Sequence, residues 1–188
     1  GWKDSPLTDR GIKQARLLSE RLSEVSLDAI YSSTSNRAVH TAEIIKGEKS
    51  LEIIKCDNLR ELSFGSWEGK TFEVNEKDSP EEWLSFWETP HLFSNDTVES
   101  FVKVQERMVK TIESIVNQHS DGNLLIVTHS IALKLLMDYF EKNSLENLWS
   151  TPPIPSTSLT LVKINNGFNE VVYKYDTSHI LLSARPLK

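Results

Sequence analysis

Apolar residues recur along the chain with two periods, one typical of helices and the other of buried strands. The helical period predicts helices over residues 5–25, 34–47, 79–90, 97–122 and 130–142. Short apolar runs predict strands over residues 27–33, 51–57, 124–128, 158–164 and 169–175. Thr8 is the expected N-cap of the first helix, and Gly47 is expected to end the second.

The order of these elements predicts the fold class. Strands alternate with helices through the first 142 residues, which is typical of an α/β protein with a mostly parallel sheet between two helical layers. The last two strands flank Asn165-Asn166-Gly167, a sequence that favours a hairpin turn. A Pro-rich loop over 150–156 precedes them. No repeat interrupts the chain, and residues 1–188 are expected to form a single domain.

Composition narrows the possible partners. The formal net charge is −6 and we find no Lys/Arg cluster, so we expect no nucleic-acid partner. No apolar run approaches the roughly 20 residues of a membrane span, so we expect no membrane partner. Cys56, the one cysteine, excludes an internal disulfide and favours a reducing, cytoplasmic location. The histidines lack metal-ligand spacing, and we expect neither a metal nor another cofactor.

Three segments place polar side chains just beyond predicted strands, where α/β sheets bind ligands. Arg37 lies in the first turn of a helix, where backbone N–H groups and a guanidinium together favour an anion. Glu61 lies among apolar residues, a setting that keeps a carboxyl protonated and suits a general acid. His129 ends the strand over 124–128. Each also has an ordinary structural explanation: an Arg37–Glu43 surface pair, an exposed loop glutamate, and a hydrogen-bonded core histidine.

Four stretches taken together resemble the histidine phosphatase superfamily, whose fold is that of the phosphoglycerate mutases. They read "GWKDSPLTDRG", "YSSTSNRAVHTAEII", "LRELSFGSWEG" and "LLIVTHS", and they occur in the order of the family. "FWETPHLF" and "LWSTPPIPSTSLTLV" are similar to bacterial broad-specificity acid phosphatases within it. The resemblance implies a three-layer α/β sandwich and an activity on phosphate esters that needs no metal.

The resemblance also implies a role for each matching residue. Arg37 matches the arginine that binds the transferred phosphoryl group, and Glu61 matches the proton donor. His129 matches the second active-site histidine, which holds a phosphoryl oxygen. Gly1 and Ser130 match positions beside the bound phosphate, although the family usually has glycine where Ser130 stands.

One departure from the family concerns the nucleophile. The family carries its nucleophilic histidine in an R-H-G motif after the first strand, and this chain contains neither that motif nor that strand. We expect both to precede Gly1, so that the domain over 1–188 is N-terminally incomplete. His40 lies in the helix that presents Arg37 and is not expected to replace the nucleophile.

The expected activity is the hydrolysis of small phosphate esters through a phosphohistidine intermediate. The expected ligand is therefore a small phosphorylated substrate or inorganic phosphate, and the sequence leaves the oligomeric state open. Two alternatives remain: a specialised relative such as an α-ribazole phosphatase or a phosphoglycerate mutase, and a non-catalytic phosphate-binding remnant. An aromatic set is expected to form either an apolar rim over the pocket or part of the core: Trp2, Trp67, Trp83, Phe86, Trp87 and Phe93.

Overall fold

A three-stranded parallel sheet forms the centre of the protein. The computed structural model describes residues 1–165 and 167–182. Strand β1 (Ala29–Ser33) pairs with β2 (Ile53–Cys56) on one side and with β3 (Leu124–Val127) on the other. All five residues of β1 are buried, because helices cover both faces of the sheet. The predicted α/β class with a parallel sheet is confirmed.

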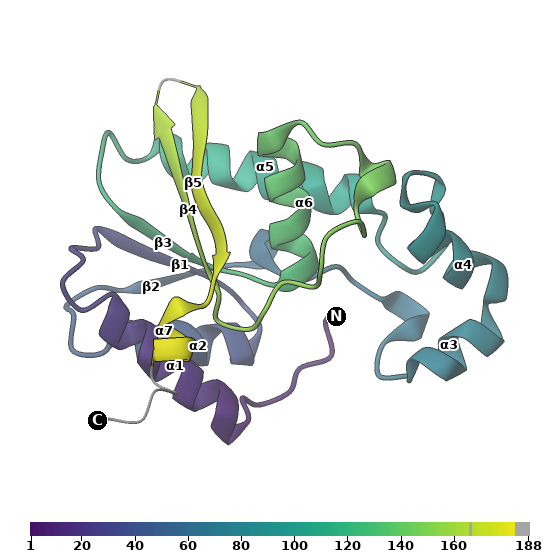
Figure 1. Ribbon diagram of the computed structural model, residues 1–188, viewed down its shortest axis with the longest axis horizontal. Coiled ribbons are helices and arrows are strands. Elements are labelled where there is room, and N and C mark those ends of the chain that lie inside the picture. Colours follow the sequence, from purple (N-terminus) through teal and green to yellow (C-terminus); the bar gives the residue numbers. More distant parts are fainter. Residues whose placement is uncertain (166, 183–188) are drawn as a thin grey trace.

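Helices pack in one layer on each side of this sheet (Figure 1). Helices α1 (Asp9–Arg21) and α2 (Asn36–Lys46) cover one face, together with the short α7 (Ser178–Leu182). Helices α5 (Phe101–Asn117) and α6 (Ser130–Glu141) cover the other. The apolar residues divide accordingly into two clusters, a larger one with α5 and α6 and a smaller one with α1 and α2.

Local hydrogen bonds set the helix boundaries. Thr8 accepts a bond from the Gly11 amide and caps α1, as predicted. Helix α5 begins later than the apolar pattern predicts, because Ser100 caps it and a turn occupies the preceding residues. In that turn, the Asn95 side chain accepts bonds from the amides of Thr97 and Val98.

Two short helices, α3 (Phe72–Asp78) and α4 (Pro80–Glu88), lie beyond the end of the sheet (Figure 1). The sequence pattern predicted α4 but not α3, which has seven residues and begins at its N-cap, Thr71. Their neighbourhood is rich in aromatic contacts. Trp67 and Phe86 are 2% and 1% exposed, so these rings belong to the core and the interpretation as a pocket rim is wrong for them.

The last two strands form a separate antiparallel sheet. Strand β4 (Leu159–Asn165) pairs with β5 (Phe168–Asp176), which confirms the predicted hairpin strands. Asn166, at the predicted turn, lies outside the described residues. Within the described part of the chain, no strand pairing joins β4 to β3, so the five strands form two sheets instead of one.

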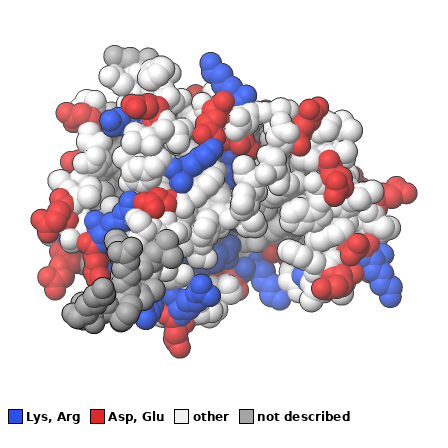
Figure 2. All heavy atoms as spheres, viewed as in Figure 1, with Lys and Arg blue, Asp and Glu red and all other residues white. Residues whose placement is uncertain are grey.

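Charged side chains of both signs cover the face of the molecule shown in Figure 2. Acidic and basic side chains are interspersed over the described residues of that face. None of the helices in the described part of the chain is long and apolar enough to cross a bilayer.

Candidate active site

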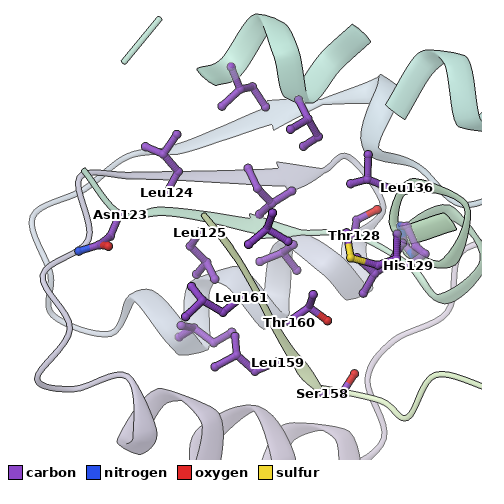
Figure 3. A pocket seen from close by; sticks show the side chains of 18 of the residues that line it. Asn123, Leu124, Leu125, Thr128, His129, Leu136, Ser158, Leu159, Thr160 and Leu161 are labelled. Atoms are coloured by element: carbon purple, nitrogen blue, oxygen red, sulfur yellow. The ribbon is translucent and has the colours of Figure 1, made fainter. Parts of the chain in front are cut away.

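The carboxyl ends of β1 and β3 bring the predicted site residues together. Arg37 follows β1 in the first turn of α2, and His129 follows β3 directly. One cavity of about 1080 Å³ is lined by every residue that the sequence nominated, namely Gly1, Arg37, Glu61, His129 and Ser130. Figure 3 shows His129 at one end of this cavity, beside Thr128. Parallel strands place their carboxyl ends at one edge of the sheet, which explains the convergence.

The His129 imidazole is bonded through both of its nitrogens. Nε2 lies 2.8 Å from the Ser33 hydroxyl and 3.3 Å from the Ser35 hydroxyl. Nδ1 lies 3.3 Å from an Arg37 guanidinium nitrogen. Arginine can only donate, so Nδ1 accepts and the proton of the neutral ring is on Nε2. Burial and the nearby Arg37 charge lower the pKa of His129 to about 3, so the ring is neutral at neutral pH.

Arg37 is fixed by backbone carbonyl groups near the start of the chain. Its Nη2 donates to the Gly1 carbonyl at 2.8 Å, and its Nη1 donates to the Lys3 carbonyl at 3.3 Å. Asp4 Oδ1 lies 3.8 Å from Nη1 and is an acidic partner of Arg37. The sequence alternative had been a surface pair with Glu43. These contacts hold the guanidinium beside His129, where it can meet an anion.

Glu61 has a more polar environment than its sequence neighbours predicted. The residue is 7% exposed, and its carboxylate accepts three backbone N–H bonds. Oε1 accepts from Leu62 at 2.9 Å and from Ala132 at 3.0 Å, and Oε2 accepts from Ile131 at 3.1 Å. Two of these donors belong to the first turn of α6, so Glu61 caps that helix. Both oxygens of this carboxylate are therefore held by backbone N–H groups.

Ser130 and Gly1 complete the predicted set. Ser130 is exposed at the first position of α6, where its backbone N–H is at the positive end of the helix. Gly1 lies against Glu68, and a Cβ atom added there would collide with the Glu68 carboxylate. The chain therefore passes close to the Glu68 side chain at this glycine.

The sequence analysis did not identify three residues that shape the site. Ser33 and Ser35 are buried and contact His129, and the "YSSTS" turn was a usable signal for them. Arg107 donates to the carbonyls of Asn58, Arg60 and Glu61 and pairs with Glu99. Nothing in the sequence pattern marked Arg107, because it lies within a long amphipathic helix.

Other histidines lie in other surroundings. His40 is exposed, and His119 bonds to the Tyr31 hydroxyl at 2.9 Å. His91 lies 3.7 Å from Glu146, and His179 lies 3.4 Å from an Arg21 nitrogen. Among residues 1–165 and 167–182, no group of three His, Cys, Asp or Glu side chains is arranged to hold a metal ion.

Comparison with known proteins gives consistent matches over most of the chain. A bacterial protein, Bacillus stearothermophilus YhfR, has a solved structure that superposes with a TM-score of 0.93 and 42% identity, over 96% of this chain and 89% of that one. The α-ribazole phosphatase from Shigella flexneri has a TM-score of 0.84 and 25% identity, over 94% of this chain and 87% of that one.

Sequence relatives agree with the structural ones. Phosphoserine phosphatase 1 of Hydrogenobacter thermophilus is 33% identical over 150 residues, which cover 80% of this chain and 71% of that protein. Residues 1–177 match the family described as the histidine phosphatase superfamily (branch 1). The chain belongs to the histidine phosphatase superfamily.

Proposed function

We propose that the protein is a phosphomonoesterase that hydrolyses small phosphate esters through a phosphohistidine intermediate and needs no metal. The observation that carries this proposal is the convergence of Arg37 and His129 at the carboxyl end of the sheet, with Glu61 lining the same cavity. Membership of the superfamily and the names of the relatives support a phosphatase or a mutase.

The residues divide the chemistry among themselves. Phosphoryl transfer depends mainly on in-line placement and on neutralising the charge of the equatorial oxygens. Arg37 supplies a permanent positive charge, and His129 supplies a ring nitrogen beside it. Glu61 would protonate the leaving oxygen and then take a proton from the attacking water. A phosphate dianion beside Arg37 would also favour protonation of His129, since it offsets the charge that now opposes it.

The nucleophilic histidine belongs, on this proposal, to a segment that precedes Gly1. The cavity supports this placement. It is lined by residues 124–129 on and after β3 and by residues 158–162 around β4 (Figure 3). The edge of β3 opposite β1 and the edge of β4 opposite β5 both face it. One extended apolar strand would pair with both edges, join the two sheets, and end beside Arg37 and His129.

We also propose a class of substrate. Relatives are named for phosphoserine, α-ribazole phosphate and phosphoglycerate chemistry, which favours a small phosphorylated metabolite. A specialised phosphatase or a mutase is the second candidate. Hydrolysis of a panel of phosphate esters separates them, because a broad profile supports the first proposal and a single strong substrate supports the second. We further propose that residues 1–188 belong to one catalytic domain in the cytoplasm.

The decisive experiment traps the intermediate. The gene product with its native N-terminal sequence and the chain that starts at Gly1 are each incubated with a ³²P-labelled ester and quenched. Label that is stable in alkali and labile in acid identifies phosphohistidine in the longer protein. Arg37→Ala should weaken phosphate binding and reduce turnover together. Phosphate binding without any label or turnover in the longer protein would refute the enzyme and favour a phosphate-binding remnant.

A further inference from the structure

A single carboxylate, that of Glu68, connects the start of the chain to the loop that carries Glu61. Its Oε1 accepts the Trp2 amide at 2.5 Å and the Phe64 amide at 3.0 Å, and its Oε2 accepts the Lys3 amide at 3.0 Å. Although its partial burial opposes this, these three N–H groups hold the pKa of Glu68 below its usual value. The residue is therefore a fixed anion.

The Gly1–Trp2 peptide links this anion to Arg37. Its N–H donates to Glu68, and its carbonyl accepts from Arg37 Nη2 at 2.8 Å. A peptide unit is planar, so fixing one end fixes the direction of the other. The negative charge at the N–H and the positive charge at the carbonyl also polarise the peptide in the same sense, which strengthens both bonds.

Further contacts tie the same segment to the proton donor. The Trp2 indole N–H donates to the Glu61 carbonyl at 2.7 Å, and the Arg60 guanidinium lies 4.2 Å from the centre of the Trp2 ring. The absence of a side chain at Gly1 allows the approach, because a Cβ there would overlap the Glu68 carboxylate. Residues 1–3 thus form a bridge between Arg37 and the Glu61 loop, and Glu68 holds that bridge.

We propose that Glu68 is a positioning residue of the phosphate site, which orients Arg37 through the Gly1–Trp2 peptide. This inference rests on the proposed function, since it assumes that Arg37 binds phosphate. On this proposal Glu68 acts through the peptide and not by binding the phosphate directly. Its loss should weaken phosphate binding only as long as Arg37 is present.

The test compares Glu68→Gln with the unmodified chain and with Glu113→Gln, an exposed control on α5. Inorganic phosphate is titrated against each protein, and the amide NMR shifts of residues 129–132 report binding at millimolar dissociation constants. Glu68→Gln should weaken binding roughly tenfold, a coupling typical of residues in one hydrogen-bond network. The Trp2 and Lys3 amides should exchange with solvent faster in this variant even without phosphate.

A double-mutant cycle distinguishes positioning from a general structural role. In an Arg37→Lys background, Glu68→Gln should change phosphate affinity by less than about twofold. The guanidinium that donates to the Gly1 and Lys3 carbonyls is already absent in that background. Glu68→Asp keeps the negative charge but moves the carboxylate away from the Trp2 and Lys3 amides, because aspartate is one methylene shorter. It provides the same test if Glu68→Gln does not fold.

Two results would overturn the positioning role: an additive effect of Glu68→Gln in the Arg37→Lys background, or unchanged exchange of the Trp2 amide. Failure of the unmodified chain to bind phosphate would instead count against the proposed function. The exchange rates would still decide whether Glu68 orders residues 1–3.

Discussion

Replacing Glu61 by glutamine separates its observed role as a helix cap from its proposed role as a proton donor. The carboxylate accepts N–H bonds from Leu62, Ile131 and Ala132, so the native side chain uses both oxygens as acceptors. Glutamine has one oxygen and one NH₂ group. If its oxygen takes the position that serves Leu62 and Ala132, its NH₂ faces the Ile131 N–H, and two donors oppose each other.

The size of the effect follows from these contacts. Removing a negative charge from a helix N-terminus costs about 0.3–1 kcal/mol, and up to about 2 kcal/mol when the site is buried. One buried N–H left without an acceptor costs about 1–3 kcal/mol. Because these contributions overlap, we expect Glu61→Gln to lower the free energy of unfolding by about 2 kcal/mol. In a domain of this size that corresponds to a fall in melting temperature of about 4–8 °C.

Urea unfolding at pH 7 measures the stability change in the chain itself, with Glu113→Gln as the control. In the enzyme that carries the nucleophile, Glu61→Gln should reduce turnover by about 10²- to 10⁴-fold and leave phosphate binding largely intact. Glutamine cannot donate a proton to an alkoxide, but it does not remove Arg37 or His129 from the site.

The two readouts can fail separately. A Glu61→Gln protein as stable as the unmodified chain would show that the α6 amides do not depend on this carboxylate. Unchanged turnover would remove Glu61 from the acid–base role, whatever happened to stability. A variant that loses stability and phosphate affinity together would mean that the cap also shapes the phosphate site.

Three further predictions test other parts of the site. Because the pKa of His129 falls from 6.5 to about 3 on folding, its contribution to stability is fully present above pH 6.5 and is lost as pH falls towards 3. Between pH 7.5 and 4.5, the free energy of unfolding in urea should therefore fall less steeply in His129→Gln than in the unmodified chain. Equal slopes in the two proteins would contradict the shift. Arg107→Lys should lower the free energy of unfolding in urea by about 3 kcal/mol, because lysine cannot reproduce the five hydrogen bonds of this guanidinium. A decrease below about 1 kcal/mol would show that these hydrogen bonds do not stabilise the fold as we expect. Gly65→Ala should lower the melting temperature, because Gly65 has a φ of +49° and an added Cβ would meet the Thr97 carbonyl; an unchanged value in a thermal scan would contradict this.

Periodicity was sufficient to predict the layers of the fold. Burial determines the apolar spacing of the helices that flank the strands over residues 27–33 and 124–128. That spacing is visible in the sequence, so the helices and strands could be predicted from it. The sequence pattern did not predict helix α3, because its apolar residues Phe72 and Val74 are 65% and 42% exposed and do not form a buried helical stripe. The later start of α5 depended on a side-chain turn at Asn95, which apolar spacing does not reveal.

The sequence nominated candidate site residues where chemistry and position coincide in a single residue. Arg37, Glu61 and His129 each carry an ionisable group within a few residues after a strand, and one cavity is lined by all three. Arg107 and Glu68 were missed because they act through backbone groups that are distant in sequence. No local pattern records which carbonyl or N–H a long side chain will reach.

Several arginine side chains surround the proposed anion site of this acidic protein. The chain has a net charge of −6, yet Arg37, Arg60 and Arg107 all lie close enough to His129 to lower its pKa. Each nearby carboxylate has a partner: Glu61 and Glu68 accept backbone N–H groups, Glu99 pairs with Arg107, and Asp4 lies beside Arg37. Because the potential of a charge is screened within about 10 Å at ordinary ionic strength, these neighbouring groups determine the potential at the site more than the distant surface charges do.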